Sequence, residues 1–89
     1  MLAVRVQISP DALFQEIGGE GVILDLASST YFGLDEVGVR LWQLLQENDE
    51  LQPAIATLLT EYDVKPEQLE TDLDRLIEEL LDAGLVRVE

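Results

Sequence analysis

The sequence predicts an α+β, winged-helix-like domain in which a three-stranded antiparallel sheet is followed by three helices. In the first third of the chain, apolar and polar residues alternate between glycine- and serine-rich turns, as in half-buried strands. After residue 35, apolar residues recur three and four positions apart, as in amphipathic helices. We expect residues 1–89 to form one domain, because 89 residues with 47% hydrophobic content support one core.

Three segments are expected to form the sheet. Alternation predicts a first strand at 4–8, and apolar residues within 13–17 indicate a second. The glycine-rich segment 18–21 predicts a turn, because glycine tolerates positive φ. A third strand is expected at 22–26, followed by a polar turn at 27–30.

The helices have recognisable ends. After a short extended piece at 31–34, Asp35 is expected to cap the first helix. Pro53 suits the first turn of the second helix, and Pro66 suits the start of the third. Gly84 is expected in the left-handed position that ends the third helix, before a short strand or tail. Trp42, in the first helix, is expected in the core.

The charge of the chain restricts its partners. Nineteen acidic and five basic residues give a net charge of −14, which disfavours binding to nucleic acid or to an anionic membrane. A basic or neutral partner is compatible with this charge, although acidity also simply keeps a small domain soluble. The start of the chain is too short and too alternating for a signal peptide, and no apolar run is long enough to span a membrane. We therefore expect a cytoplasmic protein.

Catalytic chemistry has no clear candidate residues. The chain has no histidine and no cysteine, so it lacks the commonest general base and the strongest nucleophile. Its serines fall in predicted turns without an evident base, and its carboxylates are spaced like the solvated face of a helix. No ligand pattern for zinc or calcium is present. We therefore expect no catalytic residue, no metal site, no cofactor and no enzyme activity.

An ordered set of motifs resembles the PqqD-like family, the recognition elements of ribosomal peptide natural-product pathways. The set comprises the Leu24-Asp25-Leu26 strand, the Tyr31-Phe32 pair, the helix entry at 34–35, Gly38 and Trp42, and the ending at 83–86. The resemblance covers roughly residues 13–86. It implies a single PqqD-like domain that binds the leader segment of a precursor peptide and presents it to a maturation enzyme. The chain resembles the standalone members of the family, and its acidic character and compact start are closer to those of lasso-peptide clusters, which work with a leader peptidase and a cyclase.

The resemblance also implies where the leader binds. In such domains the leader adds as a strand to the third strand of the sheet, and its side chains enter a groove beside the third helix. On this basis the expected strand residues are Val22, Ile23, Leu24, Asp25 and Leu26, with Tyr31 nearby.

Helical spacing indicates which residues of the third helix line that groove. Leu69, Leu73, Ile77 and Leu80 fall at the centre of the apolar stripe. A groove is lined by the margin of a stripe, so the expected helix residues are Asp72, Arg75, Leu76 and Glu79. Leu76 alone is equally compatible with a place in the core.

Two other functions are compatible with the sequence. One is a chaperone of the pyrroloquinoline-quinone type, whose partner is a radical enzyme. A second is a docking module that binds an enzyme but no free peptide. A winged-helix DNA binder conflicts with the charge, and a small acid–base enzyme lacks candidate residues.

Overall fold

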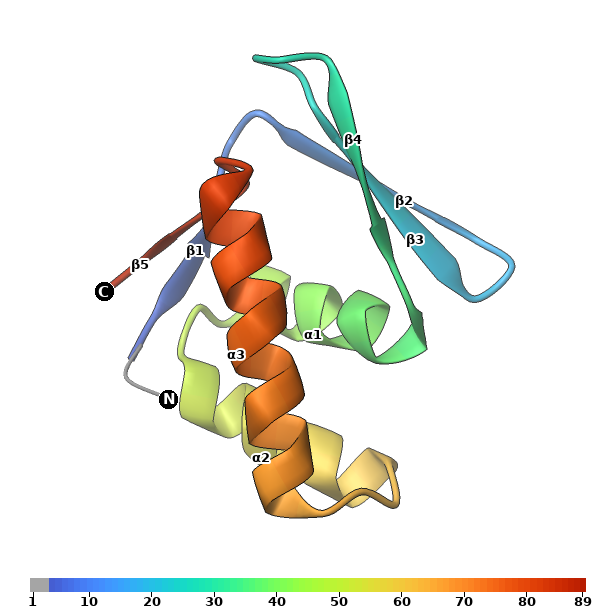
Figure 1. Cartoon of the computed structure of the whole chain (residues 1–89), viewed down its shortest axis with the longest axis vertical. Helices are drawn as coiled ribbons and strands as arrows, with labels where there is room; N and C mark the ends of the chain where they lie inside the picture. Colours follow the sequence, from blue (N-terminus) through green and yellow to red (C-terminus); the bar gives the residue numbers. More distant parts are fainter. Residues whose placement is uncertain (1–3) are drawn as a thin grey trace.

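The structure is a computed structural model that describes residues 4–89. The single domain expected over 1–89 also includes residues 1–3, which lie outside the described residues. The elements, shown in Figure 1, are in chain order β1 (Val6–Ile8), β2 (Ala12–Ile17), β3 (Glu20–Asp25), β4 (Thr30–Leu34), α1 (Glu36–Glu47), α2 (Leu51–Glu61), α3 (Pro66–Asp82) and β5 (Val86–Val88).

The main sheet has the order β2-β3-β4, and both neighbouring pairs are antiparallel. Ile17 pairs with Glu20, so the β2–β3 loop consists of Gly18 and Gly19. Both have positive φ, 61° and 85°, as a two-residue hairpin turn with two left-handed positions requires. Three strands followed by three helices confirm the predicted fold class.

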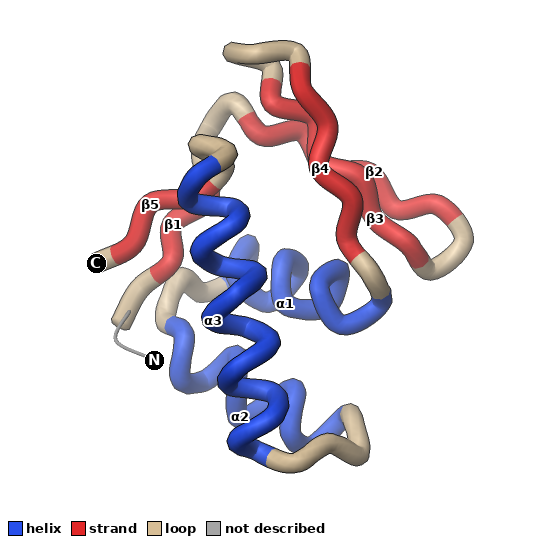
Figure 2. Tube along the Cα trace, in the orientation of Figure 1, coloured by secondary structure: helices blue, strands red, loops and turns tan. Residues whose placement is uncertain are grey.

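The membership of the sheet differs from the prediction. The first expected strand forms β1, which pairs with β5 in a separate two-stranded ribbon (Figure 2). The expected extended piece at 31–34 is β4, the third strand of the sheet. Short hairpin loops join β2, β3 and β4, whereas a turn containing Pro10 separates β1 from β2. The alternation of apolar and polar residues identified the strands, but the length of the loops between them determined which strands pair.

Side-chain and backbone caps hold the helix ends. Asp35 accepts a hydrogen bond from the Gly38 N–H at 2.9 Å, which confirms the predicted cap of α1. Beyond α3, Gly84 has φ 75° and its N–H donates to the carbonyl of Leu81, while Leu85 N–H donates to Leu80. These two bonds form a Schellman motif, as the position of Gly84 predicts.

The core lies between the inner face of the sheet and the three helices. The centre of the α3 stripe is buried as expected, at Leu69, Leu73, Ile77 and Leu80. Ile23 of β3 is fully buried and Trp42 of α1 is 1% exposed, which places Trp42 in the core as predicted. α1 approaches β3 closely at Gly21, where an added Cβ would lie 2.7 Å from atoms of Phe14 and Val39. This packing fixes the sheet on α1 and leaves β4 beside α3.

Candidate functional site

A groove of about 530 Å³ lies between β4 and α3. Its volume falls in the range of ligand sites in proteins. The residues that line it come from β4, the start of α1, the α2–α3 link and α3: Phe32, Gly33, Leu34, Asp35, Val37, Gly38, Val64, Leu69, Asp72, Leu73, Arg75, Leu76 and Glu79.

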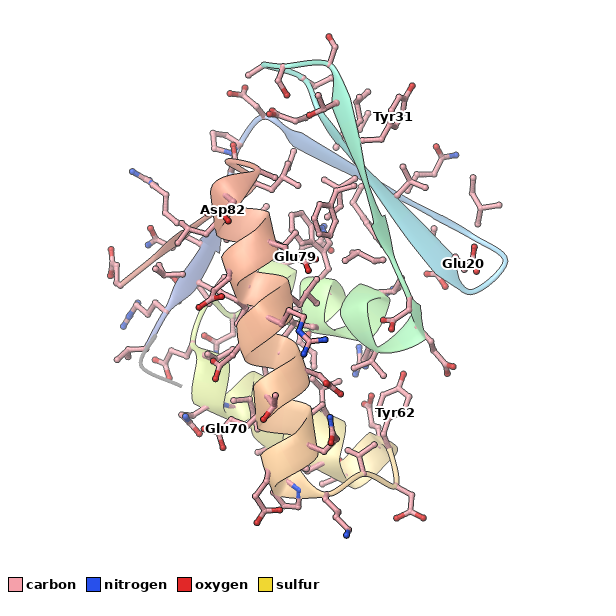
Figure 3. All side chains as sticks on the ribbon, in the orientation of Figure 1. Glu20, Tyr31, Tyr62, Glu70, Glu79 and Asp82 are labelled. Carbon is pink, nitrogen blue, oxygen red and sulfur yellow. The ribbon has the colours of Figure 1, made fainter. Side chains whose placement is uncertain are left out.

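One margin of α3 forms the helix side of this groove. The structure brings together all four residues expected there, Asp72, Arg75, Leu76 and Glu79. Asp72, Arg75 and Glu79 are exposed, whereas Leu76 is half-buried and packs against the core. In Figure 3, Glu79 lies on the side of α3 that faces the sheet, and Glu70 lies on the opposite side. Leu76 therefore contributes to both the core and the groove.

The opposite side of the groove is an edge strand. β4 is paired only with β3, so half of its backbone groups have no partner strand. Antiparallel pairs alternate between those that exchange two hydrogen bonds and those that exchange none. Which residues of β4 face the open edge follows from one bond at the end of the β2–β3 ladder.

That bond joins the Leu26 N–H to the carbonyl oxygen of Asp11, at 2.9 Å. Leu26 therefore turns its backbone groups toward β2, and by alternation Leu24 and Val22 do the same. The intervening residues of β3 turn toward β4, where the register pairs them with Thr30, Phe32 and Leu34. The other two residues of β4 are Tyr31 and Gly33, and their N–H and C=O groups point to the open edge beside α3.

This geometry corrects the predicted strand. The segment Val22, Ile23, Leu24, Asp25 and Leu26 was expected to accept an added strand, but residues 22–25 belong to β3. β3 is the central strand, and its backbone groups are already paired with β2 and β4. The expectation fails because the first predicted strand, β1, pairs with β5 and is not part of the main sheet. The strand that was expected to be the third of the sheet is therefore its second, central strand.

Asp25 and Leu26 have other places in the fold. Asp25 is 7% exposed, and its carboxylate accepts hydrogen bonds from the Ala27 N–H at 3.1 Å and the Ser28 hydroxyl at 2.8 Å. It therefore stabilises the β3–β4 turn rather than lining the groove. Leu26 lies in that turn and is exposed.

Tyr31 lies on the strand that forms the open edge, but its side chain points away from the groove. It is 76% exposed and extends from the outer face of the sheet (Figure 3). The register aligns it with Leu24 and Leu13 in one row across the three strands, and Leu13 is also exposed. The side chain of Tyr31, expected near the bound leader, therefore does not line the groove, and only its backbone lies at the open edge.

The sequence reasoning missed the sheet side of the groove. The missed residues are Phe32, Gly33 and Leu34 of β4, Asp35, Val37 and Gly38 at the start of α1, and Val64 of the α2–α3 link. The Tyr31-Phe32 pair before a capped helix was the available signal, since an aromatic extended segment is a good strand. That this strand forms an edge could be seen only after the pairing was known.

The groove combines an apolar floor with charged margins. Among its lining residues Leu69 and Leu73 are buried and Leu76 is half-buried, whereas the charged residues Asp35, Asp72, Arg75 and Glu79 are exposed. A second hollow, near the β2–β3 turn, is lined mainly by polar and charged residues: Glu16, Glu20, Asp35, Glu36, Arg40 and Gln43. The groove beside β4 is therefore the better site for a ligand with apolar side chains.

Comparisons with known proteins show the family of the chain and support its fold. A model of the family described as "Coenzyme PQQ synthesis protein D (PqqD)" matches residues 20–86. A structure described as "TbiB1 in Complex with the TbiA(beta) Leader Peptide" is 34% identical, with a TM-score of 0.84 over 91% of this chain and 94% of that chain.

A second structure, "Lasso peptide synthetase B1 complexed with the leader peptide", is 22% identical and supports the fold. Its TM-score is 0.80, over 93% of this chain and 98% of that chain. No curated protein matches the chain. Among residues 4–89, no helix is long and apolar enough to cross a membrane.

Proposed function

The chain belongs to the PqqD family, and from this premise we propose that it binds the leader segment of a ribosomally made precursor peptide and presents it to a processing enzyme. The partner enzyme in this proposal is the leader peptidase or cyclase of a lasso-peptide pathway. The structure that is 34% identical to this chain is described as a complex with a leader peptide. The site of leader binding is the groove between β4 and α3.

The open edge of β4 beside an apolar groove is the observation that carries this proposal. An extended peptide can pair with the free backbone groups of Tyr31 and Gly33, which provides affinity with little sequence selectivity. Alternate side chains of an added strand point to one face, so every second leader residue enters the groove. Contacts with the apolar floor around Leu76 then provide selectivity.

In this proposal the protein is a binding partner and not a catalyst. It acts in the cytoplasm, where a ribosomally made precursor is available. The chain supplies no histidine or cysteine for catalysis, so the chemistry belongs to the enzyme that receives the leader. Strand addition leaves the rest of the precursor free to reach that enzyme.

Presentation to an enzyme requires a second surface, and the outer face of the sheet suits it. Leu13, Ile17 and Tyr31 are 56%, 63% and 76% exposed on this face. Exposed apolar groups gathered on one face indicate a protein contact. Because β4 supplies both this face and the leader edge, an enzyme bound here would lie next to the bound leader. Leu13→Glu should then leave leader affinity unchanged and lower the rate of leader removal.

The direct test is fluorescence anisotropy of a labelled leader peptide, from a lasso-peptide precursor of the same genome, titrated with the purified chain. We expect saturable binding at about micromolar concentration or tighter, lost when the leader is scrambled. No binding to the free leader, combined with binding to a leader peptidase or cyclase of the same genome, would instead support a docking module.

The family description names coenzyme PQQ synthesis, which favours one second candidate, a peptide chaperone for a radical enzyme. The two candidates differ in the peptide that they bind. Two unlabelled peptides distinguish the candidates when each is titrated against the labelled leader bound to the protein: the leader of a lasso precursor and a pyrroloquinoline-quinone precursor peptide. Only the peptide that the protein recognises should displace the labelled leader.

A further inference from the structure

Two oppositely charged side chains of the groove have no ion-pair partner within residues 4–89. Arg75 and Glu79 both line the groove and lie one helical turn apart on α3. Neither takes part in the salt bridges of the described chain, which involve Arg5 and Arg40.

The order of residues along α3 explains why these two side chains do not pair. An acid followed four residues later by a base is the favourable arrangement on a helix, and Arg75 followed by Glu79 is the reverse. The acid on the other side, Asp72, already accepts a hydrogen bond from Gln68 Nε2 at 3.0 Å. Arg75 and Glu79 therefore remain available to a ligand in the groove.

The spacing of the two charges matches that of an added strand. Four residues of an α-helix advance about 6 Å along its axis. Side chains on one face of a strand recur about every 6.6 Å. Two successive groove-facing residues of a bound leader can therefore lie opposite Arg75 and Glu79 at the same time.

We propose that Arg75 and Glu79 are specificity-determining residues that select a leader with an acidic residue opposite Arg75 and a basic residue two positions away, opposite Glu79. The inference rests on the proposed leader binding and adds a charge pattern to it. Backbone pairing alone allows a strand to slip by two residues without changing the face that it presents. The charge pair removes this ambiguity, because slippage would place at least one leader charge away from its partner.

The test is selection of a displayed library of random twelve-residue peptides against the wild-type protein, Arg75→Glu, Glu79→Lys and Arg87→Glu. Arg87 is an exposed basic residue of β5, outside the groove, and provides the matched control for net charge. We expect wild type and Arg87→Glu to enrich an acidic and a basic residue two positions apart. Arg75→Glu should replace the preference for an acidic peptide residue with a preference for a basic one. Glu79→Lys should replace the preference for a basic residue at the second position with a preference for an acidic one.

A single enriched peptide then tests the pairing directly. Arg75→Glu should weaken its binding about fivefold, as expected for an exposed charge pair, and replacing the acid of the peptide with lysine should restore it. Identical pools from wild type and Arg75→Glu, or an equal change with Arg87→Glu, would overturn the assignment while leaving peptide binding intact. Failure of the wild-type protein to enrich any peptide would contradict leader binding itself, and with it this inference.

Discussion

Asp35 and Gly38 are joined by a hydrogen bond of 2.9 Å from the Gly38 N–H to Asp35 Oδ1, and both residues line the groove. The cap of α1 is therefore part of the candidate site. An added Cβ at Gly38 would lie 3.1 Å from Leu34 Cδ2 and 3.3 Å from Asp35 Oδ1, so the cap also depends on the small residue at its third position.

Asp35→Ala removes this cap and should lower the free energy of unfolding by about 1 kcal/mol. Asp35→Asn is the matched variant, because asparagine caps a helix about as well as aspartate but carries no charge. Urea unfolding of both proteins tests the cap. Equal destabilisation by alanine and asparagine would show that the negative charge, rather than the hydrogen bond, stabilises α1.

Arg40 and Glu61 predict a dependence of stability on pH. Arg40 Nε and Nη2 each donate to a carboxylate oxygen of Glu61 at 2.8 Å, which ties α1 to the end of α2. The hydrogen bond to Arg40 holds the pKa of Glu61 below its ordinary value of 4.5. A lowered folded-state pKa gives stability that is present above the unfolded-state pKa and is lost as pH falls through the folded-state pKa.

We therefore expect the unfolding midpoint of the wild type to fall more steeply below pH 4.5 than that of Glu61→Gln. The difference should be small, because the pair is partly exposed to solvent. Urea unfolding across the acid range measures it. Parallel curves for the two proteins would show that the ion pair contributes nothing to folding.

Trp42 should determine stability rather than recognition. It is 1% exposed, and its ring centroid lies 6.2 Å from that of Phe14. Trp42→Ala should therefore cost about 3–5 kcal/mol of unfolding free energy. Trp42→Phe should cost less, because Nε1 has no hydrogen-bond partner to lose within the described chain. An unchanged melting temperature in Trp42→Ala, with loss of leader binding, would refute the core assignment.

Local patterns predicted the elements of this fold better than its pairings. The cap at Asp35, the end of α3 at Gly84 and the buried stripe of α3 each depend on residues close in sequence, and the structure confirms all three. The same stripe indicated the margin that lines the groove. The partner of each strand depends instead on distant segments, such as β5, which pairs with β1. For this reason the sequence identified the helix side of the groove but placed its strand side on β3.

The helix side can be tested with Asp72 and Leu76. Both line the groove, and Asp72 is exposed while Leu76 is half-buried. Asp72→Ala should weaken leader binding without affecting folding. Leu76→Ala should weaken binding and also lower stability, because this side chain packs against the core. Anisotropy titrations and thermal melts of both variants separate the effects, and unchanged affinity in both would refute this margin of α3 as a binding surface.

The strand side can be tested with proline, because the pairing pattern assigns alternate N–H groups of β4 to opposite sides. The Gly33 N–H points to the open edge, so Gly33→Pro removes no hydrogen bond within the sheet, and proline is tolerated at such edge positions. Phe32 pairs with Ile23 and its ring packs against the core, so Phe32→Pro both breaks the ladder and removes this packing, and should destabilise the protein by at least about 3 kcal/mol. We expect Gly33→Pro to unfold near the wild-type midpoint but to bind the leader about tenfold more weakly, since one backbone hydrogen bond is lost. Gly33→Ala is the matched control. It keeps the N–H, and open space surrounds an added Cβ there, so it should bind like the wild type. Full binding by Gly33→Pro would show that the leader does not pair with β4, whereas an equal loss of binding in Gly33→Ala would indicate steric exclusion rather than a missing hydrogen bond.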